Sequence, residues 1–330
     1  MLRTHYFFER RIMPAKRRKK KACYSGIGGQ AVIEGIMMKN RDKYSVAVRT
    51  PEGDIDVTVE EYESFAPSKA LTRIPFIRGV FNFIDSLILG IRTLNYSASF
   101  YEEEQDTHKK DKILDRIFKD NSEKVLSMVA VIFSIALAVG LFVLLPYYLS
   151  RLLEKVIVSD TAIAILEGVL RVLIFVGYIV LISCMKDIRR VFMYHGAEHK
   201  CINCIETGHE LTVENVRAAS RQHKRCGTSF LFFVVFLSVI LFIFIRVEEP
   251  VARIAIRLLL IPVIASLSYE IIRLAGKSSN IFVRILSAPG MWLQRLTTRE
   301  PDDKMIEVGI AAVEAVFDWK EYLQKQSDEL

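Results

Sequence analysis

Four long apolar runs dominate the pattern of hydrophobic and polar positions along the chain. They cover residues 125–150, 161–185, 227–245 and 254–275, and the first and third contain no charged residue. At about 1.5 Å per residue, each run makes a helix long enough to cross a bilayer core of roughly 30 Å. The pattern therefore predicts four membrane-spanning helices.

A fifth apolar stretch, residues 74–94, differs because polar residues recur on one helical face. Arg78, Asp85 and Arg92 follow at seven-residue intervals, with Asn82 on the same face. This periodicity is typical of an amphipathic helix that lies along the membrane surface. We therefore expect residues 67–122 to form an interfacial helix followed by a charged linker.

The segment before this helix alternates apolar and polar residues with the period of a strand. Tyr44, Val46 and Val48 alternate with polar neighbours, turn-forming residues follow at 51–54, and the alternation resumes over residues 55–59. Such a pattern is typical of two strands joined by a turn. It predicts a β-hairpin in a small cytosolic β-rich module of residues 24–66.

The residues from Gly26 to Ala31 formally match the G-x-G-x-x-A fingerprint of dinucleotide-binding folds. That fingerprint must follow a strand, whereas a polybasic segment precedes it here, so a tight backbone turn is the better interpretation. Glu34 follows in an apolar stretch. It is either a turn-facing carboxylate or a member of a functional site, and we favour the turn.

Two helical segments are expected after the last apolar run, within residues 276–330. Residues 281–296 mix apolar residues with arginines and contain Pro289-Gly290, which predicts an interfacial segment kinked at that pair. Residues 305–323 have apolar side chains at helical spacing. We expect them to form a soluble amphipathic helix that packs on the cytosolic module.

Composition limits the class of protein. Hydrophobic residues make up 51% of the 330 residues and charged residues 25%. This is too apolar for an ordinary soluble domain and too charged for a chain wholly within a membrane. The five cysteines lack the paired spacing of a disulfide framework, so we expect reduced thiols in the cytoplasm.

Basic residues indicate the orientation in the membrane. The first 21 residues contain nine Lys or Arg and one acid, and residues 186–226 contain eight Lys or Arg and five acids. Under the positive-inside rule, both termini and this central segment lie in the cytoplasm of a multi-pass protein of the inner membrane. We expect residues 1–23 to be a disordered tail that binds anionic lipid headgroups rather than nucleic acid.

The candidate chemistry lies in the polar segment between the second and third apolar runs. Four of the six histidines and three of the five cysteines fall between His195 and Cys226. His195, Glu198 and His199 have the H-x-x-E-H order of inverted zinc hydrolases, in which two histidines four residues apart bind the metal from one helical face. Glu198 can then act as the catalytic base that takes a proton from metal-bound water.

Two further metal interpretations remain open. Cys201-x-x-Cys204 and His223-x-x-Cys226 have the paired spacing of a zinc ribbon, which would make a closed structural site rather than an open catalytic one. Glu270, near the cytoplasmic end of the fourth apolar run, is a candidate third ligand of an open site. Its alternative role is an ion pair with an arginine three residues later.

Several short sequences resemble the YqhQ-like family, a family of bacterial membrane proteins of unknown function described as predicted metal-dependent enzymes. They are residues 28–35 (GGQAVIEG), 194–199 (YHGAEH), 211–217 (LTVENVR) and 225–230 (RCGTSF). The resemblance extends from about residue 26 to the C-terminal region and implies a metal-dependent membrane protein without a defined reaction. In this family Cys201 is often another residue and Lys224 is usually proline, which argues against the closed site.

We therefore expect a mainly α membrane protein: a four-span transmembrane helical bundle of residues 123–275, with interfacial helices and a small cytosolic α+β module. A cytosolic loop of residues 186–228 contains the site. The expected metal is zinc, because thiolate and imidazole ligands favour it over magnesium. The candidate ligands are His195, His199, His223, Cys226 and Glu270.

Three functions remain as hypotheses. The leading one is a zinc-dependent hydrolase that acts at the cytosolic membrane face on an unknown peptide or lipid-like substrate. The main alternative is a non-enzymatic membrane scaffold or interaction protein whose loop is folded by structural zinc. A small transporter is the third, and it would require polar residues that face one another in the middle of the membrane.

Overall fold

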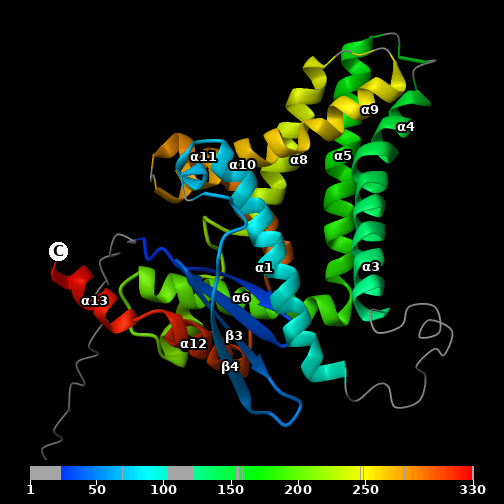
Figure 1. The fold of residues 1–330 in the computed structure, drawn as a ribbon. Helices are drawn as coiled ribbons and strands as arrows, with labels where there is room; N and C mark the ends of the chain where they lie inside the picture. Colours follow the sequence, from blue (N-terminus) through cyan, green and yellow to red (C-terminus); the bar gives the residue numbers. More distant parts are fainter. Residues whose placement is uncertain are drawn as a thin grey trace, which may run out of the picture.

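The computed structural model describes residues 24–68, 70–102, 122–153, 156–157, 159–245, 247, 249–277 and 280–328. The described chain is mainly helical and contains one small antiparallel sheet (Figure 1). The basic tail predicted for residues 1–23 lies outside the described residues, as does most of the charged linker, residues 103–121.

Four strands come first in the chain, and helices make up nearly all of the rest. The strands are β1 (Gly28–Val32), β2 (Gly35–Asn40), β3 (Lys43–Arg49) and β4 (Ile55–Glu61). The helices are η1 (Leu71–Arg73), α1 (Ile77–Glu102), α3 (Ser122–Val139), η2 (Gly140–Leu144), α4 (Leu145–Arg151), α5 (Asp160–Ser183), α6 (Lys186–Glu206), α7 (Val213–Ala218), α8 (Gly227–Phe244), α9 (Pro250–Leu259), α10 (Ile261–Lys277), α11 (Ile281–Thr297), α12 (Asp303–Val316) and α13 (Trp319–Asp328).

The strands pair with their sequence neighbours in the order β1-β2-β3-β4. The predicted hairpin is confirmed, because β3 and β4 pair antiparallel with Val46 opposite Thr58. Strands β1 and β2 were not predicted. The tight turn expected from Gly26 onward is limited to Gly26 itself, whose φ is 83°. Glu34 lies in the turn between β1 and β2 with a φ of 48°, as the turn interpretation predicted. Since the glycine-rich segment is itself a strand, it does not form a dinucleotide-binding turn.

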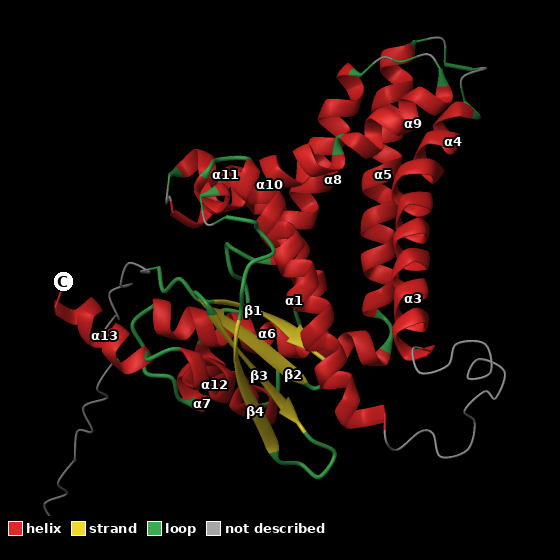
Figure 2. Ribbon diagram, in the orientation of Figure 1, coloured by secondary structure: helices red, strands yellow, loops and turns green. Residues whose placement is uncertain are grey.

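Both faces of the sheet are buried, which explains why β2 and β3 contain almost no exposed residue. Side chains alternate along a strand, so Ile36 and Ala47 join a core formed with α6 and α12, whereas Met37 and Val46 join a second core on the α1 side. Figure 2 shows the sheet between these helices. The predicted cytosolic module therefore includes helices from the middle and the end of the chain.

Helix α1 connects the sheet to the apolar helices. Its 26 residues extend about 39 Å at 1.5 Å per residue. The first half packs on α10, and the second half covers the sheet. The polar face that was predicted to lie along a membrane instead forms ion pairs, such as Arg78 with Glu270 and Arg92 with Glu60. Its position relative to a membrane stays a prediction.

Within the described residues, four helical segments are long and apolar enough to cross a membrane, at nearly the predicted positions: Met128–Arg151, Thr161–Ser183, Gly227–Phe244 and Val251–Ala275. The fourth is divided into α9 and α10 at Leu260, two residues before Pro262, which cannot donate a backbone hydrogen bond. In the first segment, the most apolar stretch of 18 residues contains no residue that is buried within the protein.

Two other predicted segments differ from the structure, and a third agrees with it in part. Residues 186–228, predicted as a loop, contain the long helix α6 and the short helix α7. Helix α11 contains Pro289 in its interior, and the kink expected there stays a prediction. The predicted C-terminal helix is divided into α12 and α13, and α12 packs on the sheet as expected.

Candidate metal centre

Helix α6 positions three of the predicted site residues. His195, Glu198 and His199 lie on one face because residues three and four apart are neighbours on an α-helix. The opposite face of α6 is fixed in the core between the sheet and α12. At Gly196 a Cβ atom would lie only 2.0 Å from the Arg299 carbonyl oxygen, so glycine allows the segment after α11 to contact α6 directly.

Cys226 completes a cluster with the two histidines. It is the N-cap residue of α8, and its sulfur lies 3.2 Å from His195 Nε2. One donor atom from each of His195, His199 and Cys226 lies within 4.8 Å of the others. A tetrahedral zinc ion with ordinary bond lengths would separate its ligand atoms by about 3.3–3.6 Å. Small side-chain movements would therefore bring all three onto one ion.

The two histidines are oriented by backbone carbonyls. His195 Nδ1 lies 2.9 Å from the Thr297 oxygen, and His199 Nδ1 lies 2.6 Å from the Arg221 oxygen. A carbonyl accepts a hydrogen bond, so each Nδ1 donates its proton to a carbonyl, and Nε2 is the nitrogen that faces the cluster and would bind a metal once it is deprotonated. Metal-binding histidines are typically held in this way by their second ring nitrogen.

Glu198 lies beside the same group and is almost fully buried. Its Oε2 is 3.7 Å from His199 Nε2 and 3.9 Å from His195 Nε2. Strand β1 covers it, since a Cβ atom at Gly29 would lie 3.1 Å from Glu198 Cγ and 2.4 Å from the Met37 carbonyl oxygen. The glycine-rich sequence thus allows the backbone to approach the site closely.

The cluster favours a thiolate at Cys226. Burial raises the pKa of this thiol, but the adjacent His195 and His199 outweigh burial and hold the pKa well below its ordinary value. Burial lowers the pKa of His195, whereas Cys226 and Glu198 raise it to about 9. The thiolate is the form that binds a metal. It is also the form used by Cys–His nucleophiles, but the second histidine in the group favours metal binding.

A cavity of about 250 Å³ opens beside the cluster. Its lining includes His195, Glu198, His199 and Cys226, together with the glycine-rich start of β1. The space leaves a position next to the three donor atoms that no described side chain fills. This arrangement matches an open site with three protein ligands rather than a closed one with four.

His223 reaches the cavity but does not join the donor group. Its Nε2 lies 3.4 Å from Glu206 Oε2, and its ring is 5.7 Å from that of His199. Gln294 fixes its backbone, donating from Nε2 to the His223 oxygen and accepting from the His223 amide. Arg225 also contacts Glu206. In this structure His223 therefore belongs to a buried polar network behind the cluster.

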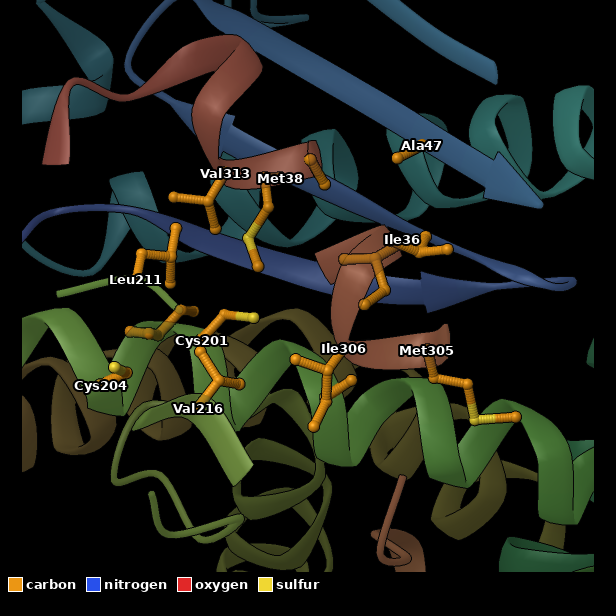
Figure 3. Close-up of a cluster of buried hydrophobic side chains, with 14 of the residues drawn as sticks. Ile36, Met38, Ala47, Cys201, Cys204, Leu211, Val216, Met305, Ile306 and Val313 are labelled. Carbon is orange, nitrogen blue, oxygen red and sulfur yellow. The ribbon is translucent and has the colours of Figure 1, made fainter. Parts of the chain in front are cut away.

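The other candidate ligands lie elsewhere. The Glu270 carboxylate pairs with Arg78 of α1, at 2.7 Å between Oε1 and Nε, instead of with the neighbouring arginine or the cluster. Cys201 and Cys204 are buried in the core on the other face of α6, and Figure 3 shows Cys201 among the apolar side chains of the sheet and α12. The structure does not bring the two cysteine pairs of the zinc-ribbon interpretation together.

Sequence reasoning did not identify the backbone oxygens of Arg221 and Thr297 or the cover provided by Gly29. The carbonyls have no sequence signal, because any residue can supply one. The Gly26–Gly29 segment did have a signal, since clustered glycines often mark a close backbone approach.

A second cluster of charged residues lies among the apolar helices. Glu167 and Arg171 of α5 pair at 2.7 Å, and Arg257 of α9 also contacts Glu167 at 2.7 Å. Polar residues thus face one another inside the bundle, as the transporter hypothesis requires. However, the cavity beside them measures about 10 Å³, which is too small for a solute.

The comparisons with known proteins agree with the resemblance found in the sequence. Residues 74–319 match a family described as "Protein of unknown function (DUF1385)". The "Uncharacterized protein YqhQ" of Bacillus subtilis (strain 168) is 34% identical over 288 residues, which cover 86% of this chain and 89% of that protein. No solved structure matches the chain. The expected relationship to YqhQ-like proteins is confirmed, and it supplies no reaction.

Proposed function

Because the chain belongs to the DUF1385 family of proteins of unknown function, we propose a function from the site itself: a zinc-dependent hydrolase at the cytoplasmic face of the membrane. The observation that supports it most is the convergence of His195, His199 and Cys226 beside an open cavity. Three protein ligands with an open position are typical of catalytic zinc sites.

The donor set fits zinc. Two imidazoles and one thiolate favour zinc over magnesium or calcium, which prefer oxygen ligands. Bound zinc would supply Lewis acidity, which polarises a carbonyl or phosphoryl oxygen and lowers the pKa of a coordinated water to about 7. The Thr297 and Arg221 carbonyls each accept a hydrogen bond from an Nδ1, which leaves Nε2 as the nitrogen that would bind the metal.

Glu198 is the proposed general base. Its carboxylate lies between the two Nε2 atoms, within 4 Å of each. It would take a proton from the attacking water as the new bond to the acyl or phosphoryl centre forms. The proton would then pass to the leaving group as the old bond breaks. The competing role for Glu198 is to orient a ligating histidine.

Several features support the proposed location. From residue 128 onward, apolar side chains cover the surface of α3, with Phe133 65% exposed and Ile132 60% exposed, as is typical of a helix surrounded by lipid. The sheet, α6 and α12 lie together, whereas α4 and α9 lie at the far end of the bundle (Figure 1). The basic residues of residues 186–226 favour the cytoplasm for the site.

Metal analysis of the purified protein tests the ligand assignment. We expect about one zinc per chain in the wild type. Zinc-finger sites with four protein ligands are worth roughly 10–16 kcal/mol, so loss of one of the three proposed ligands should cost about 3 kcal/mol, or on the order of 100-fold in affinity. His199→Ala and Cys226→Ser should therefore lose zinc, whereas His209→Ala, a matched control on the same segment, should retain it.

The same measurement separates the predicted ligands from one another. Glu270→Gln should retain zinc, because Glu270 pairs with Arg78 in the structure. Full zinc occupancy in both His195→Ala and His199→Ala would refute the assignment. Wild-type protein without metal but with a rapidly alkylated Cys226 would instead indicate a cysteine nucleophile.

Glu198→Gln tests the catalytic role. The change nearly preserves shape but removes the base, so zinc should stay bound while hydrolysis of fluorogenic ester, amide and phosphodiester probes falls by at least about 100-fold. Loss of zinc together with activity would show that Glu198 orients a ligand. Zinc binding by the wild type without hydrolysis of any probe class would favour the scaffold with structural zinc.

A further inference from the structure

A second and larger cavity adjoins the candidate metal centre. It measures about 700 Å³, within the range of small-molecule binding sites. It shares Gly26, Gly28, Gly29, Arg225, Cys226 and Gly227 with the smaller cavity. A molecule in the larger cavity can therefore reach Cys226 without passing through protein.

One wall of this larger cavity is apolar and belongs to the bundle. Phe83 of α1, Phe230 and Leu231 of α8, and Ile272 of α10 line it. The rings of Phe83 and Phe230 are 5.3 Å apart. Leu231 is 43% exposed and lies in the first two turns of a segment that can cross a membrane. This wall is thus continuous with the apolar surface of the bundle.

A second group of lining residues forms a polar, positively charged wall. It includes Lys39 at the end of β2 and Arg41 in the next turn, with Arg225 shared with the smaller cavity. The Lys39 ammonium lies 3.9 Å from the centroid of the Tyr62 ring. Burial lowers the pKa of Lys39 although the charges of Asp85 and Asp42 oppose this effect, and an anionic ligand would compensate for the loss of water.

One acid, Asp85, is among the described residues that line the cavity, and its charge acts on Lys39. Asp85 accepts hydrogen bonds from Tyr62 Oη at 2.9 Å, Ser64 Oγ at 2.6 Å and the Phe65 amide at 2.8 Å, and it is 6% exposed. These neutral donors hold the carboxylate in place without removing its negative charge. Since Glu206 partners Arg225, Lys39 and Arg41 supply two positive charges against the single negative charge of Asp85.

We propose that the larger cavity binds an anionic amphiphile from the membrane, with its acyl chain against Phe230 and Leu231 and its anionic headgroup against Lys39 and Arg41. That the amphiphile is a substrate rests on the proposed hydrolase function. That it binds in the cavity does not. Cys226 lines both cavities, so an amphiphile in the larger one lies next to the candidate metal centre. A water-soluble anion would leave the apolar wall unused.

Photolabelling in uncharged detergent tests the proposal. Two lysolipids with the same photoactivatable acyl chain serve as probes, one with an anionic phosphoglycerol headgroup and one with zwitterionic phosphocholine. Labelled peptides are then identified by mass spectrometry. The anionic probe should label α1 near Phe83 and α8 near Leu231 more strongly, by about 5-fold for each basic residue that contacts the headgroup.

Variants locate the bound probe. Lys39→Gln with Arg41→Gln should reduce labelling by the anionic probe to that of the zwitterionic one, whereas Lys43→Gln, an exposed lysine on β3, should not. Leu231→Trp fills the apolar part of the cavity and should lower labelling by both probes at least about 10-fold. Leu87→Trp, at an exposed position of α1 outside the cavity, is its control.

One variant separates this proposal from the proposed function. His199→Ala should abolish zinc binding and hydrolysis yet retain preferential labelling by the anionic probe. Equal labelling by the two probes, or labelling unchanged by Leu231→Trp, would overturn the proposal. Displacement of the probe by glycerol phosphate alone at the same concentration would also overturn it and assign the cavity to a soluble phosphate ester.

Discussion

The charged cluster inside the bundle allows a prediction: removal of its one carboxylate should destabilise the protein far more than removal of one of its two arginines. The Glu167 carboxylate contacts two guanidinium groups, Arg171 Nη2 at 2.7 Å and Arg257 Nη1 at 2.7 Å. The exposed fractions of the three side chains are 7%, 4% and 5%. The described residues of this cluster thus hold one negative and two positive charges away from solvent.

Glu167→Gln would leave two buried guanidinium groups without a counter-charge. Removal of one partner from a buried ion pair typically costs about 3–5 kcal/mol, and here two arginines lose the same carboxylate. Arg171 keeps the Phe142 carbonyl oxygen at 3.0 Å, which limits the loss. We expect the free energy of unfolding to fall by roughly 4 kcal/mol.

Arg257→Met should cost far less. It leaves Glu167 paired with Arg171, so the cluster becomes neutral, and methionine retains part of the arginine stem's packing. We expect a change of about 1 kcal/mol in either direction. The difference of roughly 3 kcal/mol between the two variants corresponds to about a 150-fold difference in the unfolding equilibrium.

The measurement is reversible unfolding of the purified variants in mixed micelles, followed by helical circular dichroism as the denaturing detergent is increased. The double variant Glu167→Gln with Arg257→Met completes the cycle and should be more stable than Glu167→Gln alone. Equal destabilisation by the two single changes would refute the reasoning, because it would show that the second arginine contributes as much to stability as the carboxylate does.

Three further predictions test other parts of the protein. Burial opposes ionisation of Glu206, but His223 and Arg225 lower its pKa to about 2. Since this pKa is below the unfolded value, Glu206 stabilises the fold above about pH 4.5 and loses that effect as pH falls towards 2. Glu206→Gln should therefore lower the free energy of unfolding at pH 7 by roughly 2–3 kcal/mol, and the free energy of unfolding of this variant should fall less between pH 4.5 and pH 2 than that of the wild type. Gly196→Ala should displace the segment around Arg299, because the Arg299 carbonyl oxygen would lie 2.0 Å from the new Cβ atom. The variant should therefore have a lower Tm and a lower zinc content. The control is Gly177→Ala, in which the new Cβ atom meets nothing within 4 Å and neither value should fall. Cys184 is exposed, unlike the buried Cys204 and Cys226, so a maleimide reagent can reach it. Because the proposed orientation places Cys184 in the cytoplasm, an impermeant maleimide should label it in a Cys23→Ser background only after the cells are opened. Labelling of Cys184 in intact cells would reverse the proposed orientation.

The sequence alone determined the elements whose cause is local. The second apolar segment was predicted at residues 161–185 and found at Thr161–Ser183, because apolar length and charge boundaries define such a helix. The spacing of His195 and His199 was enough to place them on one helical face. The β3–β4 hairpin followed from alternation and turn residues.

Strands β1 and β2 could not be predicted in the same way. A strand that is buried on both faces does not alternate between apolar and polar residues. Ile36 and Met37 are both apolar because they belong to different cores, so the sequence around them lacks the alternation that indicates a strand. The glycines that form β1 indicate a turn in isolation. They form a strand through pairing with β2, and at Gly29 a side chain would collide with the Met37 carbonyl of β2 and crowd Glu198 of α6.

Tertiary structure decided which residues lie together in the candidate metal centre. A helix turns about 100° per residue, so Cys201 lies about 200° around α6 from His199 and enters the core. Whether Cys226, His223 or Glu270 joined the two histidines depended on how α8, α10 and α1 pack, since Arg78 takes Glu270 and Glu206 takes His223. Contacts between residues far apart in sequence have no local signal, and they alone selected the third donor.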